Sequence, residues 1–298
     1  MKIFLKAAAA LLLLALAVWA IGSDSQPEGS VNAAPLTGGD PAWRRSDVWD
    51  DGKAELCAYD VTWAHYGHQY GGRALLVLVK EPWAPDLDVK ADGPRPDGFD
   101  VLKLNHIRDV QTGIYAYHQM ASVYTRRDSG ALRKLTATSS EACGVSTAEV
   151  TGGRLATRSY FDGQGDRAMA WPDGALPEDG LPASLRDYVV GRAPAALSIF
   201  PSLLASRFPE LKPVTYQVEK REIAAVETPE GPRPAVEIRL SAGSSVLAYA
   251  FDRESPYRLL RFAREDGTVY RLAKCERLAY WEMHDPGGEA WLPWSAKK

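Results

Sequence analysis

The segment LLRFAREDGTVYRL, residues 259–272, decides the fold class that the sequence predicts. Asp266-Gly267 lies near its centre, and such a pair supplies the positive φ angles of a tight two-residue hairpin turn. Apolar residues on both sides of the pair predict two antiparallel strands. Upstream, the segment VEIRL at residues 236–240 alternates apolar and polar side chains, which is typical of a strand with one buried face.

The same signals recur along most of the chain. Gly152-Gly153 marks a second hairpin, between strands predicted at 145–150 and 154–161. Further strands are predicted over residues 54–63, 73–80, 99–106, 113–126, 131–139, 214–222 and 245–251. No long amphipathic helix separates them, which disfavours a parallel sheet. We therefore predict a mainly β fold, an antiparallel open or half barrel of about eleven strands with a short helical insertion.

The predicted insertion lies near residues 181–208. Pro182 occupies a position that a first helical turn tolerates, and apolar residues then recur at helical spacing at Leu185, Tyr188 and Val189. A second short helical piece is predicted from Ser202 to Phe208, ending at Pro209. This helical hairpin either covers the open side of a curved sheet or forms a surface excursion, and the sequence leaves both alternatives open.

The N-terminus predicts export. Lys2 and Lys6 precede an apolar run of 15 residues from Ala7 to Ile21, the order found in a secretory signal over residues 1–22. The run is shorter than the roughly 20 residues of a membrane-spanning helix, so we expect cleavage and a periplasmic or extracellular protein that meets the membrane only through this signal. Residues 23–42 are rich in Ser, Gly, Pro and Ala and predict a flexible tether. Residues 43–298 then form a single β domain.

The charge of the chain bears on which partners it can bind, and its cysteine content bears on which disulfides it can form. The chain has 35 basic and 38 acidic residues and no basic stripe, which disfavours nucleic acid as a partner. Three cysteines, Cys57, Cys143 and Cys275, allow one disulfide in an oxidising compartment, but the sequence leaves the pairing open. The oligomeric state is not predicted.

Motifs for catalysis and cofactor binding are weak. His65 and His68 form an H-x-x-H pair in what reads as a loop, and His106 or His118 on neighbouring strands could approach them. A zinc site needs three or four ligands, and two exposed histidines are the simpler interpretation. There is no G-x-S-x-G motif and no glycine-rich phosphate loop. We predict no cofactor and no enzyme activity; the alternative is a secreted hydrolase with histidine and carboxylate groups gathered across strands.

The tyrosines of residues 113–126 are the most suggestive feature for binding. We expect Tyr115, Tyr117 and Tyr124 to share one face of this strand, either as ordinary sheet core or as an amphipathic wall for a lipid-like ligand. In the second case they line a cavity, and a lid covers it with Leu185, Tyr188, Val189, Leu203 and Leu204. Such a cavity needs a volume of about 300 Å³ or more.

Several blocks resemble a family of exported bacterial proteins of unknown function: residues 52–79, VLKLN at 101–105, TGIYAYHQMASVYT at 112–125, SSEACG at 139–144 and IFPSLLASRF at 199–208. This resemblance implies no catalytic residue. The late segment, residues 245–283, is similar to the strands of periplasmic half barrels such as the lipoprotein carriers LolA and LolB. That similarity implies a concave sheet able to hold acyl chains, and hence a non-enzymatic envelope protein that binds a lipid or amphipathic small molecule or serves a structural role.

Overall fold

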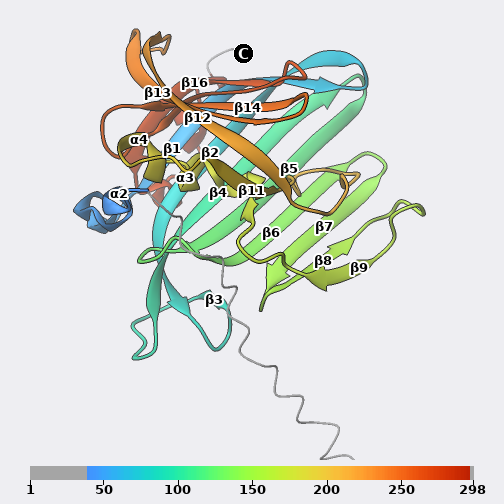
Figure 1. Ribbon diagram of the computed structural model, residues 1–298, viewed down its shortest axis with the longest axis horizontal. Helices are drawn as coiled ribbons and strands as arrows, with labels where there is room; N and C mark the ends of the chain where they lie inside the picture. The colour runs from blue at the N-terminus through green and yellow to red at the C-terminus, as the bar shows by residue number, and fades with distance from the viewer. Residues whose placement is uncertain (1–38, 296–298) are drawn as a thin grey trace, which may run out of the picture. The chain divides into compact units, whose positions relative to one another are not determined.

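The computed structural model describes residues 39–295, which form one large sheet with a few short helical segments (Figure 1). The predicted signal (1–22) and most of the predicted tether (23–42) lie outside the described residues. Within residues 39–295, no helix has the length and apolar composition needed to cross a membrane.

The first half of the chain builds successive antiparallel strands: β1 (Ala54–His65), β2 (His68–Ala84), β3 (Val89–Lys90), β4 (Phe99–Thr112), β5 (Tyr115–Arg126), β6 (Leu132–Glu141), β7 (Gly144–Thr151), β8 (Arg154–Arg158) and β9 (Arg167–Ala170). The second half returns through β10 (Leu176–Pro177), β11 (Ala196–Phe200), β12 (Val214–Val226), β13 (Arg233–Ala242), β14 (Ser245–Asp252), β15 (Leu259–Arg264) and β16 (Val269–Leu278). β16 pairs with β1, so the two halves join into one sheet.

The sheet is open. Its order runs from β10 through β11 to β16, then β1, β2, β4 and on to β9, and β3 pairs only with β2. The prediction of a mainly β, open antiparallel architecture is confirmed, with one parallel pair, β10 with β11. The strand count of about eleven was wrong, because the sheet that residues 39–295 form has 16 strands. The strands without a predicted counterpart, β3, β9, β10 and β11, have two to five residues each, too few to show an alternating pattern.

Two turns show how local residues set the pairing. Gly152 and Gly153 form the predicted two-residue turn between β7 and β8, both with positive φ. Between β15 and β16 the predicted two-residue turn is instead a four-residue connection, 265–268, in which Asp266 Oδ1 accepts a hydrogen bond from the Thr268 amide at 2.7 Å. The Asp266 carboxylate thus satisfies the Thr268 amide within the connection, and this bond favours the longer turn.

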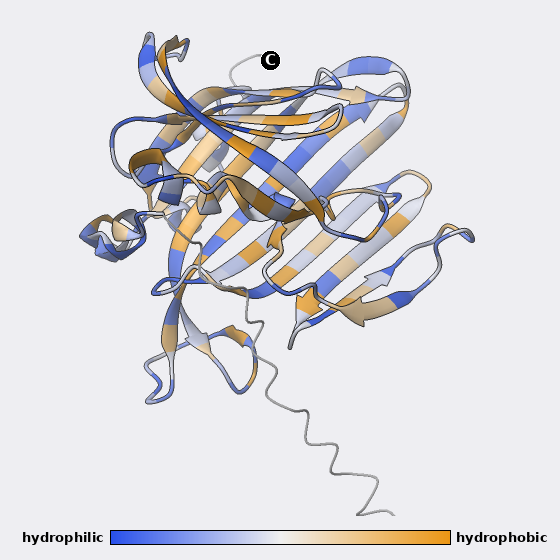
Figure 2. Cartoon of the chain, viewed as in Figure 1, coloured by the Kyte–Doolittle hydropathy of each residue, from blue (hydrophilic) through white to orange (hydrophobic). Residues whose placement is uncertain are grey.

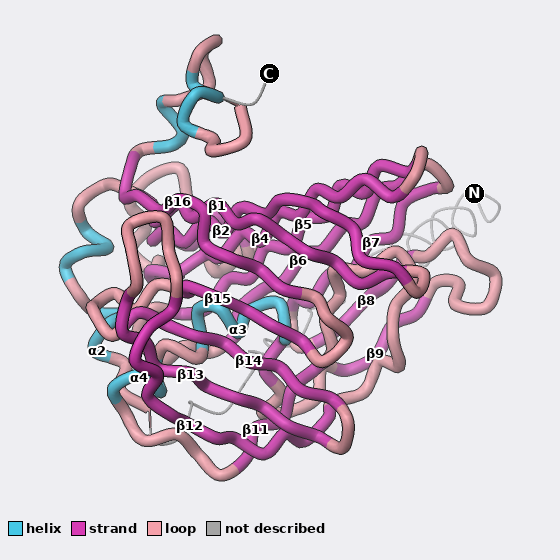
Figure 3. Tube along the Cα trace, turned by 90° about the horizontal axis from the view of Figure 1, so that it is seen from above, coloured by secondary structure: helices cyan, strands magenta, loops and turns pink. Residues whose placement is uncertain are grey.

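Of the two helical pieces predicted for the insertion, only the first forms. Short helices α3 (Leu181–Ser184) and α4 (Asp187–Val190) form, and in Figure 3 the strands curve around α3. The second predicted helix, residues 202–208, is wrong: strand β11 precedes it and the segment is irregular. Its backbone groups bond to side chains of other elements; Ser146 Oγ, for example, donates to the Ser206 carbonyl at 2.6 Å. These tertiary partners replace the hydrogen bonds that a helix would make internally.

The two faces of the sheet have different coverings. The larger apolar core lies on the concave face, where strand residues pack against the insertion through side chains such as Leu185 and Tyr188. On the opposite face a smaller cluster around Leu56 and Val79 is covered by C-terminal side chains that include Trp291. The strands in Figure 2 alternate between apolar and polar residues, consistent with these two environments.

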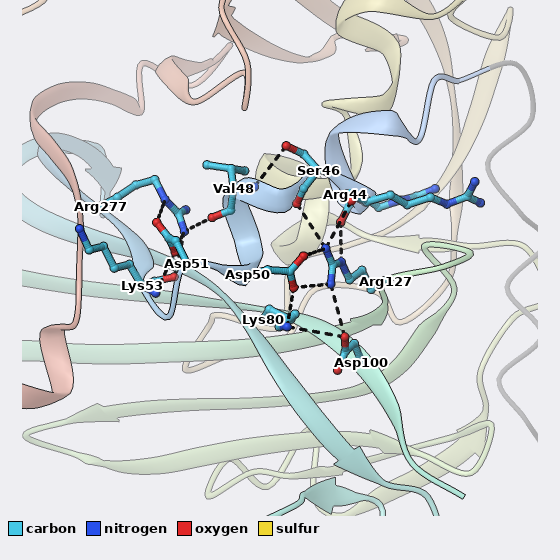
Figure 4. Close-up of polar contacts among 11 residues, drawn as sticks. Arg44, Ser46, Val48, Asp50, Asp51, Lys53, Lys80, Asp100, Arg127 and Arg277 are labelled. Atoms are coloured by element: carbon cyan, nitrogen blue, oxygen red, sulfur yellow. Dashed lines mark hydrogen bonds and ion pairs between the residues drawn. The ribbon is translucent and has the colours of Figure 1, made fainter. Parts of the chain in front are cut away.

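A network of ion pairs holds the N-terminal segment of the domain, α2 (Ala42–Arg45) and the 3₁₀ turn η1 (Asp47–Asp50), against the sheet (Figure 4). The Arg127 guanidinium donates to both oxygens of Asp50, at 2.7 and 2.8 Å, and to the Arg44 carbonyl at 2.9 Å. Lys80 Nζ also contacts Asp50, at 2.5 Å. Hydrogen bonds from Arg127 and Lys80 hold the pKa of the Asp50 carboxyl well below its usual range. The segment is therefore fixed to β2 and to the end of β5.

A disulfide joins Cys57 on β1 to Cys275 on β16, and these residues are also register partners in the sheet. Cys143 is a free, exposed thiol in the turn between β6 and β7. The structure thus assigns the pairing that the sequence left open, at the seam between the two halves of the sheet.

Candidate ligand cavity

A cavity of about 570 Å³ lies on the concave side of the sheet. Most of its lining residues come from β1, β2, β4, β5, β12, β14, β15 and β16, and also from the 3₁₀ turn η2 (Glu178–Gly180), Pro182 of α3 and residues 201–209. The volume falls within the roughly 300–1,000 Å³ of cavities that hold small ligands. It exceeds the minimum of about 300 Å³ that the cavity hypothesis requires.

Strand alternation brings polar and aromatic side chains into this cavity. His106 and Arg108 are two residues apart on β4, so they point to the same face, and Tyr117 and Gln119 do the same on β5. Arg108 and Gln119 are register partners. Because the two side chains of a register pair lie next to each other on one face, this pair meets inside the cavity wall.

Arg108 is the centre of a buried hydrogen-bond network. Its side chain donates to Gln119 Oε1 at 2.8 Å from Nε and 2.5 Å from Nη2, and to the Leu204 carbonyl at 3.3 Å. Its guanidinium lies over the Trp63 ring, 4.6 Å from the centroid. Arg108 is only 9% exposed, yet none of the ion pairs within residues 39–295 involves it. A buried positive charge without a carboxylate partner is energetically costly and therefore marks the site.

Tyr270 links Arg108 to His106. Arg108 Nη1 donates to the Tyr270 hydroxyl at 3.3 Å, and that hydroxyl lies 3.2 Å from His106 Nε2. Because a guanidinium can only donate, the tyrosine proton is free to go to Nε2 of a neutral imidazole. Burial, with Arg108 nearby, lowers the pKa of His106 to about 3. His106 is therefore an uncharged hydrogen-bond acceptor, and is poorly suited to act as a general base at neutral pH.

Two acidic residues of the cavity lining, both in the 3₁₀ turn η2, already have partners. Glu178 forms an ion pair with Arg264, and Asp179 accepts hydrogen bonds from Ser202 Oγ at 2.5 Å and from the Leu203 amide at 2.8 Å. Burial raises the pKa of both carboxyl groups above their usual values. The Asp179 bonds also hold Ser202 and Leu203 beside the cavity.

His65, Tyr66, Tyr117 and Glu141 form the end of the cavity nearest the turn between β1 and β2. The Tyr66 and Tyr117 hydroxyls are 2.8 Å apart. Tyr66 and Gly67 form the turn with φ of 50° and 74°, and His65 and His68 are register partners across it. The H-x-x-H pair is therefore a two-residue hairpin rather than the longer loop that we predicted.

The three predicted tyrosines do not share a face. Tyr117 is buried and lines the cavity, whereas Tyr115, also on β5, is 37% exposed and does not line it. Tyr124 contacts Trp83, with ring centroids 5.0 Å apart, on the other face. The expectation of one shared face was wrong, because Tyr117 and Tyr124 are separated by an odd number of positions and strand residues alternate.

The predicted lid residues lie close to the cavity but mostly behind its wall. Leu185, Tyr188 and Val189 are buried in the main apolar core and do not line the cavity. Leu203 is also buried, and Leu204 does line it. The insertion thus closes the concave face through Pro182 and residues 201–209, while the helical side chains anchor it from behind.

Few side chains that could bind a metal or catalyse a reaction lie close together among residues 39–295. Within residues 39–295, the one cluster of metal-ligand types is Glu55 with Cys57 and Cys275, and these two cysteines form the disulfide. His118 pairs with Asp109 at 2.6 Å on the exposed face, outside the cavity. His65 shares the cavity with Glu141, and burial lowers the pKa of this histidine.

Sequence reasoning missed the residues at the centre of the cavity, Trp63, Arg108, Gln119 and Tyr270. One signal was present: on β4 the alternation that runs through Leu102, Leu104 and Val110 places polar His106 and Arg108 at inward positions. A charged residue at an inward position of a strand indicates a buried polar network.

Comparisons with known proteins add little on function. No protein-family model and no curated protein matches the chain. The chain is similar to the crystal structure of a β-barrel-like protein of a domain of unknown function, DUF1849, from Brucella abortus. The two sequences are 10% identical, the similarity covers 76% of this chain and 98% of that chain, and the TM-score is 0.45. The resemblances to an exported family and to LolA and LolB stay predictions.

Proposed function

We propose that this chain is an exported, non-enzymatic protein that binds a lipid-like or amphipathic small molecule in the concave cavity. The observation that carries the proposal is the cavity of about 570 Å³, whose lining combines apolar and aromatic side chains with polar and charged groups, among them the buried Arg108. Ligand-binding cavities have this composition, because apolar surface supplies affinity and a few polar groups fix orientation. Leu76, Leu259 and Phe262 provide apolar surface, and Arg108 with its partners provides the polar centre.

Export is supported by chemistry in the folded domain as well as by residues 1–22. The Cys57–Cys275 disulfide is of the kind that persists in oxidising compartments and is rare in the cytosol. A periplasmic or extracellular location would also bring the cavity near membrane lipids or their products.

A variant whose larger side chain fills the cavity tests the binding proposal. Leu76 faces the cavity from β2, whereas Leu75, the preceding residue, packs against the cluster on the opposite face. The variant Leu76→Trp should therefore fill the site, and Leu75→Trp is its matched control. We expect the delipidated protein to bind the neutral fluorescent probe phenylnaphthylamine, and L76W to bind it about tenfold or more weakly than L75W. No binding by the unmodified protein, or equal loss in both variants, contradicts the proposal.

The alternative function, a secreted hydrolase, rests on His65 and Glu141, which share one end of the cavity. Glu141 bonds to Tyr160, and no hydrogen bond or ion pair joins it to His65 within residues 39–295. Turnover of a glycan or ester that is abolished by His65→Gln would favour this alternative over simple binding.

A further inference from the structure

We propose that the ligand of this cavity carries an anionic head, a carboxylate or a phosphate, and that Arg108 receives this head while the apolar lining holds a single hydrocarbon chain. This inference rests on the proposed function, since it names the class of ligand that the same cavity takes.

The first observation is the unbalanced charge of Arg108. Among the residues that the structure describes, four carboxylates line the cavity, and each one is engaged elsewhere: Glu141 with Tyr160, Glu178 with Arg264, Asp179 with Ser202, and Asp266 with the Thr268 amide. None forms an ion pair with Arg108, which is only 9% exposed. Burial raises the pKa of the Asp179 carboxyl and the nearby Arg108 charge offsets part of that rise, but no carboxylate within residues 39–295 pairs directly with the guanidinium. A buried charge without a direct partner is disfavoured, so an anion that enters the cavity gains by pairing with it.

The second observation is an available donor. A guanidinium has five N–H groups. Nε and Nη2 of Arg108 together serve Gln119 and the Leu204 carbonyl, and Nη1 donates once, to the Tyr270 hydroxyl. The second N–H of Nη1 therefore has no partner within residues 39–295. It is a donor on a side chain that lines the cavity.

The third observation is that the guanidinium is held in place. Trp63 lies under it at 4.6 Å, and Gln119 is itself bonded to Ser139 Oγ at 2.9 Å. A donor fixed in this way loses little side-chain entropy when it binds, because its position is already set. Trp63, Leu76 and Phe262 supply the apolar surface beside it, where each buried methylene contributes about 0.8 kcal/mol.

Three ligands of equal chain length and different head groups separate the contribution of the head to affinity from that of the hydrocarbon chain. Laurate, dodecyl phosphate and dodecanol are titrated below their aggregation concentrations against the mature protein loaded with phenylnaphthylamine, and displacement is measured. We expect at least one of the two anions to bind about tenfold or more tightly than the alcohol, as a charge-assisted hydrogen bond to a buried donor implies. The tighter anion identifies the head as carboxylate or phosphate.

The decisive variant gives Arg108 a carboxylate partner from a neighbouring side chain, which neutralises its charge. Gln119→Glu keeps the side-chain shape and places a carboxylate against Nε and Nη2 of Arg108. We expect Q119E to lose the preference for anions, so that the ratio of anion affinity to dodecanol affinity falls about tenfold or more relative to the unmodified protein. Gln111→Glu, an equal charge change at an exposed position of the neighbouring strand β4, should retain the preference. Arg108→Met is a second variant, with folding of each checked by circular dichroism.

The outcomes distinguish the two proposals. If probe and dodecanol bind but the anions bind no more tightly, or if folded Q119E keeps the anion preference, the anionic head is wrong while the cavity still binds. If neither the probe nor any of the three ligands binds, the proposed function itself fails.

Discussion

Cys57 and Cys275 face each other across the seam where β1 pairs with β16, and their disulfide closes a separation of 218 residues. Besides this disulfide, an antiparallel ladder that runs from Ala54–Leu278 to Thr62–Val269 joins β1 to β16. The covalent bond therefore lies where the two sequence halves of the fold must find each other.

Removal of this disulfide should destabilise the domain by about 2–5 kcal/mol, since a cross-link over so long a separation strongly constrains the unfolded chain. Urea denaturation of the double variant C57A/C275A measures the change in the free energy of unfolding. Cys143→Ala, at the exposed thiol, is the control and should shift the midpoint little. A double variant as stable as the unmodified protein would show that the β1–β16 ladder suffices.

The buried ion pair between Glu55 and Arg186 should matter more than surface pairs. Arg186 lies between α3 and α4, and it donates to both oxygens of Glu55 on β1, at 2.6 and 3.2 Å. Glu55→Gln leaves a buried guanidinium short of its partner, so we expect a loss of about 3–5 kcal/mol in thermal or urea unfolding.

Glu210→Gln breaks the exposed pair with Lys212 and should cost less than about 1 kcal/mol. If both variants lose equally little stability, the insertion is not anchored through Arg186.

Asp187 should make stability fall as pH rises through the weakly acidic range. Burial, only partly offset by Arg44 and a hydrogen bond from Trp43, raises the pKa of its carboxyl from 3.8 to about 6. The folded state therefore holds this proton more tightly than the unfolded state between about pH 4 and pH 6, and stability from this group is full below pH 4 and lost through pH 6. Asp187→Asn should remove this downward contribution. The free energy of unfolding of the unmodified protein and of Asp187→Asn is measured across that pH range. A difference between the two proteins that does not change with pH would refute this prediction.

Two adjacent glycines on β2 should respond in opposite ways to alanine. A Cβ at Gly72 would lie 2.5 Å from Val110 Cγ2 and 2.7 Å from the Asp109 carbonyl oxygen, whereas one at Gly71 would meet nothing within 4 Å. Gly72→Ala must push β2 from β4, and we expect a loss of about 1–3 kcal/mol. Gly71→Ala should leave stability unchanged or raise it slightly. Equal melting temperatures for the two variants would contradict this difference.

Much of the fold follows from local patterns. Alternation along residues 236–240 and the glycine pair at 152–153 predict strands and a turn where β13, β7 and β8 are found. These signals are local, because a strand with one buried face repeats every two residues whatever its partners are. The very short strands β3, β9 and β10 carry no such repeat, and tertiary pairing alone makes them strands.

The sequence by itself determined the β class, its mostly antiparallel and open character, and the residues available for one disulfide. Tertiary structure alone decided which cysteines pair and which side chains meet in the cavity, because β1 and β16 are far apart in the sequence and are neighbours only in the folded sheet. Arg108 on β4 and Tyr270 on β16 are 162 positions apart, yet they share a hydrogen bond. Alternation tells which face a residue takes, but the neighbours on that face depend on sheet order, which no local pattern encodes.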